Sequence, residues 1–300
     1  MLIAAFTWTE FAQQIAAGIR EGAVYAGLAL ALVIIYRSTR VINFAQGEMA
    51  TFTTFVAWSL MNHGLSFWTA FPIVLAVAFI GGVAIERVMI RPVESAPVLT
   101  IVIITLGLAL LLNGLTNLIW GGGNRQFNGP FSTRTLDVGG VPISVQDIGI
   151  VAVSLALVAL LGLFFRFTKL GLALRAAALN PSSSRLVGVR VSWMLALGWG
   201  LAAVLGAVAG MMVAPIVFLD PNMMQTILLY AFAAAVLGGL DSPIGAVIGG
   251  LLLGVIMTLV GRYVGFVGSA LKLPTALLLI LLLLLVRPGG LFGRVAVRRV

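Results

Sequence analysis

Hydrogen-bonding side chains are concentrated in one short segment of an otherwise apolar sequence, residues 40–48, which read RVINFAQGE. Asn43 and Gln46 lie three residues apart, so they share a face if the segment is helical, and Glu48 follows directly. Polar groups within a membrane are costly and tend to face a cavity or the bundle interior. The cluster therefore predicts part of a solute pathway. The alternative is that Glu48 pairs with a nearby arginine at the membrane interface and only anchors the helix.

A second set of polar residues lies in the apolar stretch 98–120. Thr105 and Asn113 are eight residues apart, about two helical turns, and predict a polar track along one helix. Hydrogen bonding between helices is the competing explanation. The predicted pathway residues are Asn43, Gln46, Glu48, Thr105 and Asn113.

Nothing in the sequence has the pattern of an enzyme. We find no nucleophile with a neighbouring base, no cluster of metal-ligand residues and no cysteine. Neither of the two lysines, Lys169 and Lys272, lies in a GxxxxGK[ST] phosphate-binding loop. We therefore predict no catalytic residue, no metal site and no cofactor in this chain. The net charge of +9 does not indicate nucleic acid, because the cations lie in short loops between apolar stretches.

The high apolar content of the sequence indicates a membrane protein. Of 300 residues, 61% are hydrophobic and only 9% are charged, which predicts an all-α polytopic membrane protein forming a single permease domain over residues 1–300. The candidate spans are 14–36, 44–60, 67–86, 98–120, 146–166, 193–217, 226–240, 243–262 and 270–287. Segments 44–60 and 226–240 fall short of the usual ~20 residues, so each is either a short span or a broken, re-entrant helix, and the count is eight or nine.

The distribution of cations sets the predicted orientation. With the 166–192 loop in the cytoplasm, thirteen cations lie on the inner side and four on the outer side. This asymmetry places the N-terminus outside and the C-terminus in the cytoplasm. The 121–146 loop is then external, and its TLDVGGVPIS stretch predicts either a short hairpin that turns at the two glycines or an irregular cap.

Pairs of glycines four residues apart recur in the apolar stretches. They are Gly18 with Gly22, Gly206 with Gly210, Gly245 with Gly249, and Gly250 with Gly254. Such spacing lets helix backbones approach closely, within the bundle or against a second subunit.

The 166–192 loop predicts two short helices joined at a proline. Pro181 disfavours helical geometry at Asn180, so the first helix ends there; Asn180 then caps the second helix, and Gly188 terminates it. Leu170, Leu174 and Ala178 predict an apolar stripe on the first helix. We expect this compact basic element to be presented to a partner; an amphipathic helix lying on lipid headgroups is the alternative.

Four motifs, spread along most of the chain, resemble those of one family. The loop reads Gly171-x-Ala-Leu-Arg175-Ala-x-x-x-Asn180-x-x-x-x-Arg185-Leu-x-Gly188. The other motifs are Asn43-Phe-Ala-Gln46-Gly47-Glu48, Ala234-Ala-Val-Leu-Gly238-Gly239-Leu-x-Ser242-x-x-Gly245-Ala and Arg287-Pro288-x-Gly290-Leu291-Phe292-Gly293. Together they resemble branched-chain amino-acid ABC-transporter permeases of the LivH type. Two departures are Gln46, where the family usually has histidine, and the serines at 182–184, where it often has acidic residues or alanine.

The resemblance implies a permease fold with two inverted repeats, in the bacterial inner membrane. It also implies a second permease subunit, two cytoplasmic ATPases that bind the ATP, and an external solute-binding protein. In such a permease the 166–192 loop contacts the ATPase, so the residues implied in coupling are Gly171, Leu174, Arg175, Asn180, Arg185 and Gly188. The implied substrates are leucine, isoleucine, valine or related compounds.

Other functions remain open from the sequence. An ion-coupled secondary transporter commonly needs carboxylates deep in the membrane, and Glu21 is the chief candidate for one in this sequence. A permease for urea or short amides is a further alternative, since an apolar-substrate pocket resembles core packing. An intramembrane enzyme or a scaffold is disfavoured by the missing catalytic residues.

Overall fold

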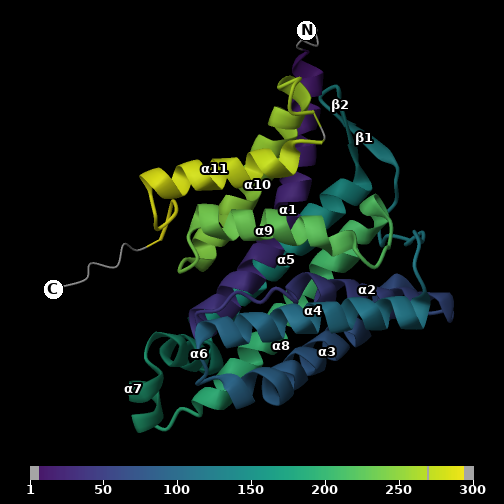
Figure 1. The fold of residues 1–300 in the computed structure, drawn as a ribbon. Helices are drawn as coiled ribbons and strands as arrows, with labels where there is room; N and C mark the ends of the chain where they lie inside the picture. Colours follow the sequence, from purple (N-terminus) through teal and green to yellow (C-terminus); the bar gives the residue numbers. More distant parts are fainter. Residues whose placement is uncertain (1–6, 269, 294–300) are drawn as a thin grey trace. The chain divides into compact units, whose positions relative to one another are not determined.

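The protein is described by a computed structural model over residues 7–268 and 270–293, and it is almost entirely helical (Figure 1). The helices are α1 Trp8–Thr39, α2 Gln46–Asn62, α3 Phe67–Ile85, α4 Val98–Trp120, α5 Val145–Phe167, α6 Lys169–Leu179, α7 Pro181–Leu186, α8 Val191–Val217, α9 Met223–Gly238, α10 Pro243–Tyr263 and α11 Lys272–Val286. After α3 the chain continues through a π-helical turn, Glu86–Ile90, and a 3₁₀ turn, Arg91–Val93. Each of the nine predicted spans is a helix, which confirms the all-α class.

Helix length separates the apolar helices into two groups. Among the described residues, six helices are long and apolar enough to cross a membrane: α1, α3 with its extension to Val93, α4, α5, α8 and α10. Helices α2 and α9 have 17 and 16 residues. At 1.5 Å per residue each is about 25 Å long, less than the ~30 Å hydrocarbon core. The predicted shortness of both is confirmed. Helix α11, with 15 residues, is also shorter than its predicted span.

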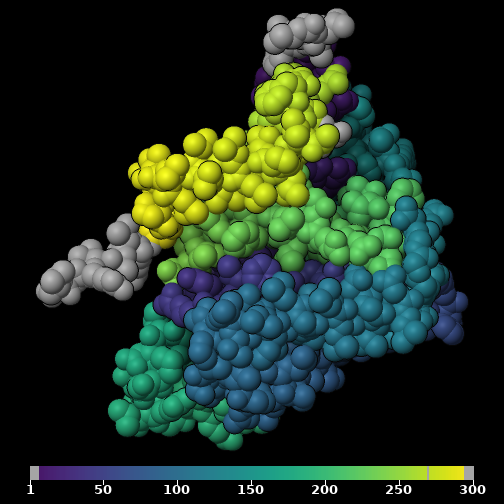
Figure 2. Space-filling model, viewed as in Figure 1, coloured from purple at the N-terminus to yellow at the C-terminus, as the bar shows by residue number. Residues whose placement is uncertain are grey.

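The chain folds into two compact units that alternate along the sequence. One comprises residues 1–30, 131–155 and 226–300, and the other comprises residues 31–130 and 156–225. In the second unit α2 and α3 pack on α8, and α4 packs on α2. Only 17% of the apolar stretch of α4 is buried, and α4 lies on the surface of this unit (Figure 2). Exposed aliphatic side chains there suit contact with lipid.

Glycine pairs bring helices of the first unit into backbone contact. A Cβ added at Gly18 would lie 2.6 Å from the Cα of Val255, and one added at Gly22 would lie 2.8 Å from the Cα of Leu251. Gly250 and Gly254 of α10 meet α1 in the same way. The predicted close packing is confirmed, and it lies within the chain.

In the second unit, Gly206 and Gly210 of α8 allow α2 to pack closely on α8. An added Cβ at Gly206 would lie 2.7 Å from Nε2 of Gln46, and one at Gly210 would lie 2.9 Å from the carbonyl oxygen of Ala50. These two positions bring the start of α2 against the middle of α8.

Two of the motifs that carry the family resemblance meet in the first unit. The amide of Leu291 donates to the carbonyl of Leu237 at 2.8 Å, and the amide of Phe292 donates to Gly238 at 3.1 Å. The segment after α11 is therefore fastened to the end of α9. Arg294, Arg298 and Arg299, which contribute to the predicted charge asymmetry, lie outside the described residues.

The 121–146 loop contains the hairpin predicted as one of its two alternatives. Strands β1 Thr135–Val138 and β2 Val141–Ser144 pair antiparallel, with Val138 opposite Val141. Gly139 and Gly140 form the turn with φ of 65° and 85°, a left-handed geometry that suits glycine at both central positions of a hairpin turn.

Candidate solute pathway and coupling segment

The start of α2 is organised by two fully buried amide side chains. The side-chain oxygen of Asn43 accepts a hydrogen bond from the amide of Ala45 at 3.0 Å, in the turn that directly precedes α2. Its Nδ2 donates to Oε1 of Gln46 at 3.2 Å. Gln46 in turn donates to the carbonyl oxygen of Ala202 on α8 at 2.8 Å. These two predicted residues therefore fix the backbone where the chain enters α2.

Glu48, which is 7% exposed, belongs to a second polar cluster with residues from two other parts of the chain. Its carboxylate accepts from Nδ2 of Asn113 at 3.3 Å and from Nε2 of Gln225 at 3.5 Å. Both amides also donate to Oδ1 of Asn222, at 3.0 Å and 2.9 Å. Asn117 adds a bond to Oδ1 of Asn113 at 3.1 Å. We call Glu48, Asn113, Asn222 and Gln225 the Glu48 cluster.

The Glu48 cluster lies well inside the length of α4. Asn113 is about 22 Å from the start of α4 and about 10 Å from its end, at 1.5 Å per residue. Farther along α2, Ser59 accepts from the indole of Trp120 at 2.6 Å, so α2 runs beside the last third of α4. Helix α2 therefore begins beside the interior of α4 and not beside either of its ends. Of the two interpretations of segment 44–60, this arrangement favours a broken helix.

Exposure changes across the Glu48 cluster. Glu48 is buried and Asn113 is half-buried, whereas Asn222 and Gln225 are exposed. Asn222 and Gln225 flank the first residues of α9, so both short helices begin at this one cluster. The cluster thus joins an accessible polar surface to a buried carboxylate.

Thr105 does not join the cluster. Its buried hydroxyl donates to the carbonyl of Val102 in its own helix at 2.9 Å. The buried hydroxyls of Thr53, Thr54, Thr116 and Thr258 also bond to carbonyls in their own helices. Thr51 differs, because its buried hydroxyl has no partner among the described residues. It lies one turn after Glu48 on α2.

The candidate coupling segment, residues 166–192, has the predicted architecture of two short helices joined at Pro181. Asn180 ends α6, and its side chain accepts from the amide of Ser183 at 3.0 Å, with Pro181 at the first position of α7. Gly188 follows with φ of 82°. The amide of Gly188 donates to Arg185 and that of Val189 donates to Ser184, which together form a Schellman motif that closes α7.

The packed face of α6 differs from the predicted stripe. Gly171, Leu174 and Ala177 are its buried residues, whereas Leu170 is 51% exposed. The reason is the entry into α6: a Cβ added at Gly171 would meet Phe164 and Phe165, so α6 lies closely against the end of α5 at this position. That contact turns Leu170 away from the packed face.

The outer face of the coupling segment is both apolar and basic. Leu172, Leu179, Leu186 and Val187 are exposed, the last two by 88% and 78%. Arg185 is exposed beside them, while Arg175 is half-buried and its Nε lacks a partner among the described residues. Exposed apolar side chains beside cations are typical of an interaction surface.

Sequence reasoning missed Asn222, Gln225 and Thr51. Asn222 follows Pro221 in a segment that resembles an external turn, and Gln225 is three residues later. Their i, i+3 spacing at the start of a short helix is the available signal. No spacing rule relates them to Glu48, which lies more than 170 residues earlier.

Long apolar helices, a short helix that begins beside the last third of α4 and a buried polar cluster define a helical membrane transport protein. Residues 14–286 match the family described as the permease component of branched-chain amino acid transport systems, and the chain belongs to that family.

Several relatives match nearly the whole chain, including the following three. It is 30% identical over 308 aligned residues to the high-affinity branched-chain amino acid transport system permease protein LivH of Salmonella typhimurium strain LT2, covering 97% of this chain and 98% of the relative. It is 31% identical to BraD of Pseudomonas aeruginosa, a permease described in the same terms, with the same coverage. A probable branched-chain amino acid transport permease of Methanocaldococcus jannaschii is 30% identical, covering 92% of both chains.

Proposed function

We propose that this chain is the membrane permease subunit of an ATP-driven importer of branched-chain or related amino acids. Family membership over residues 14–286 supports the permease role, and the names of the relatives support the substrate class. Within the chain, the observation that carries the proposal is the Glu48 cluster, where two short helices begin beside α4.

The Glu48 cluster is the proposed gate of the solute pathway. The Asn113 amide has two hydrogens and three acceptors, Glu48, Asn222 and the carbonyl of Pro221. The Glu48 carboxylate accepts hydrogen bonds from two amides, and each of these amides also donates to Asn222. Opening requires these bonds to be exchanged for bonds to a passing solute. A carboxylate and several amides match the ammonium and carboxylate groups of an amino acid.

Asn43, Gln46 and Thr105 have supporting parts in this proposal. Asn43 and Gln46 hold the backbone at the entry to α2, which keeps Glu48 in place. The Thr51 hydroxyl, which has no hydrogen-bond partner within the described part of the chain, is the additional candidate for contact with solute. Thr105 extends the polar side of α4 toward its start.

The coupling segment transmits force in this proposal. The Thr168 side chain, which accepts from the amide of Gly171 at 2.9 Å, caps α6, and Asn180 caps α7. With the Schellman motif, these caps make residues 168–189 a compact element, and the exposed leucines and Arg185 provide its contact surface. A cytoplasmic ATPase docks there, and its closure moves α8, on which α6 packs, and the end of α5, which contacts the backbone at Gly171. ATP is bound and hydrolysed on that partner and not on this chain.

The complete importer contains two permease subunits, two ATPases and an external solute-binding protein. The chain resides in the cytoplasmic membrane, with its N-terminus outside and its C-terminus in the cytoplasm, and it does not bind nucleic acid. The cation asymmetry supports this orientation.

One observation favours a second candidate function, ion-coupled transport. Glu48 lies deep along α4, where coupling carboxylates of such carriers are found. Glu21 is less suited to that role, because Arg20 lies 3.7 Å from its carboxylate and Tyr25 donates to it at 3.4 Å.

Reconstitution in vesicles tests the proposal. The chain is incorporated with its candidate ATPases and binding protein, and uptake is measured for a panel of amino acids, urea and short amides. We expect uptake of an aliphatic amino acid that requires ATP hydrolysis and survives an ionophore. Uptake by the chain alone, driven by an ion gradient and abolished by Glu48→Gln, would establish the second candidate and refute the first.

A further inference from the structure

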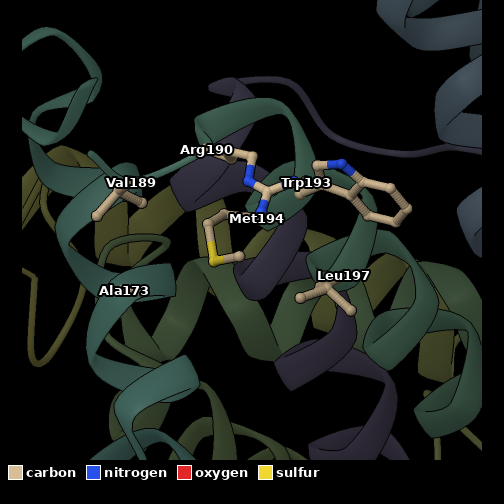
Figure 3. A pocket seen from close by; sticks show the side chains of 6 residues that line it. All are labelled: Ala173, Val189, Arg190, Trp193, Met194 and Leu197. Carbon is tan, nitrogen blue, oxygen red and sulfur yellow. The ribbon is translucent and has the colours of Figure 1, made fainter.

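A cavity of about 380 Å³ lies between α6 and the first turns of α8 (Figure 3). Arg190 and Trp193 are its polar and aromatic residues. The other lining residues are apolar: Ala173, Val189, Met194 and Leu197. A cation on one side and apolar side chains on the other suit a ligand that has an anionic group and an apolar part.

A second cation lies beside the same indole. The guanidinium carbon of Arg87 is 3.7 Å from the centre of the Trp193 ring, a close cation–π contact. Nε and Nη2 of Arg87 are buried and have no hydrogen-bond partner among the described residues. The acid next to it in the chain, Glu86, is buried at 1% exposure. The segment from 166 to 192, which contributes Ala173, Val189 and Arg190 to the cavity, contains five cations and no carboxylate, whereas Glu86 offsets part of the charge of Arg87 and Arg91.

The cavity is placed at the end of a helix suited to a membrane. Arg190 directly precedes α8, which is long and apolar enough to cross a bilayer. Arginine and tryptophan at such a helix end occupy the level of the lipid headgroups, while Met194 and Leu197 follow toward the hydrocarbon. A ligand from the bilayer can reach this position without crossing water.

We propose that the cavity binds an anionic phospholipid. Its phosphate pairs with Arg190, with Arg87 adding positive charge nearby, and its acyl chain lies along Met194, Leu197 and Ala173. A soluble phosphate would leave the apolar wall unused, and a zwitterionic lipid would gain less from the arginines. This proposal does not depend on which solute the importer carries.

Native mass spectrometry of the full chain in detergent tests this binding. The protein is mixed with phosphatidylglycerol or with phosphatidylcholine of the same acyl chains. The monodisperse protein fraction is then collected, and the number of lipid molecules bound per protein is measured. We expect retention of phosphatidylglycerol above phosphatidylcholine. Arg190→Gln should lower phosphatidylglycerol retention about fivefold, the effect of one cation worth about 1 kcal/mol near a lipid surface.

Two further variants separate the cavity from general charge. Ala173→Leu fills the apolar part and keeps every cation, so it should also lower retention. Arg166→Gln removes one exposed cation of the same loop outside the cavity and should retain lipid as the wild type does. Unchanged retention in either cavity variant, an equal loss in Arg166→Gln, or equal retention of phosphatidylcholine would overturn the proposal.

Discussion

The side-chain amide of Asn113 donates a hydrogen bond to the carboxylate of Glu48 at 3.3 Å. Asn113 lies two-thirds of the way along α4, and Glu48 lies in the first turn of α2. A residue that the sequence places at the start of a span is thus found deep along a neighbouring helix. This relationship favours a broken helix over a short span for segment 44–60, and it underlies the proposed gate.

Removing the Asn113 side chain should impair transport more than folding. Hydrogen bonds to charged groups contribute about 1.5–3 kcal/mol, so we expect Asn113→Ala to change ATP-dependent uptake by about tenfold or more. Uptake per reconstituted complex is the measurement. Thr116→Val is the matched control, because this buried hydroxyl on the same helix bonds only to Leu112 among the described residues. Equal effects of the two variants would contradict the gate.

Adding one methyl group at Gly206 should destabilise the packing of α2 on α8. The new Cβ would lie 2.7 Å from Nε2 of Gln46 and would displace that amide from the carbonyl of Ala202. Overpacking of this kind costs about 1–3 kcal/mol. Thermal unfolding in detergent measures the change.

The control for this change is Gly107→Ala on α4, where an added Cβ meets nothing within 4 Å. We expect that variant to be neutral or more stable by up to about 1 kcal/mol, because alanine favours the helix. A Gly206→Ala protein as stable as the control would show that α2 and α8 are not closely packed.

Loss of the Asn180 cap should loosen α7. The side chain of Asn180 satisfies the amide of Ser183, and replacing such a cap by alanine costs about 1 kcal/mol. Asn180→Ala should therefore raise hydrogen exchange at Ser183 about fivefold, whereas Asn180→Asp should keep it near the wild-type rate. Ser182→Ala, at an exposed neighbouring position, provides the control. Exchange that is unaffected in Asn180→Ala would argue against the cap.

Charge reversal at Arg185 should uncouple ATP hydrolysis from uptake. Arg185 is exposed on α7, so Arg185→Glu introduces repulsion toward an acidic partner without burying a charge. Like-charge contacts at an interface cost several kcal/mol, and we expect uptake per ATP hydrolysed to fall about tenfold or more.

Arg175→Glu should have the same effect, but Arg175 is half-buried, so its assembly with the ATPase must be measured in parallel. Arg134→Glu, in the 121–146 loop far along the chain from α7, is the control for charge alone. Normal coupling in Arg185→Glu would count against the docking surface proposed for α7.

The coupling segment and the glycine pairs could be predicted from the sequence because local rules govern them. A proline disfavours helical geometry at Asn180, an asparagine caps the next helix, and Gly188 adopts the left-handed geometry that ends it. The spacing of Gly206 and Gly210 likewise indicates a close helix contact. It does not say that the contact is with the start of α2.

What the sequence determined by itself was the class of molecule, the positions of its helices and the caps of α6 and α7. Those features depend on composition and on residues within a few positions of one another. The tertiary structure alone decided that Glu48 meets Asn113, Asn222 and Gln225, and that α6 packs through Ala177 and not through Leu170. Both outcomes depend on which helices become neighbours, and helical periodicity aligns residues within a helix without selecting its partner.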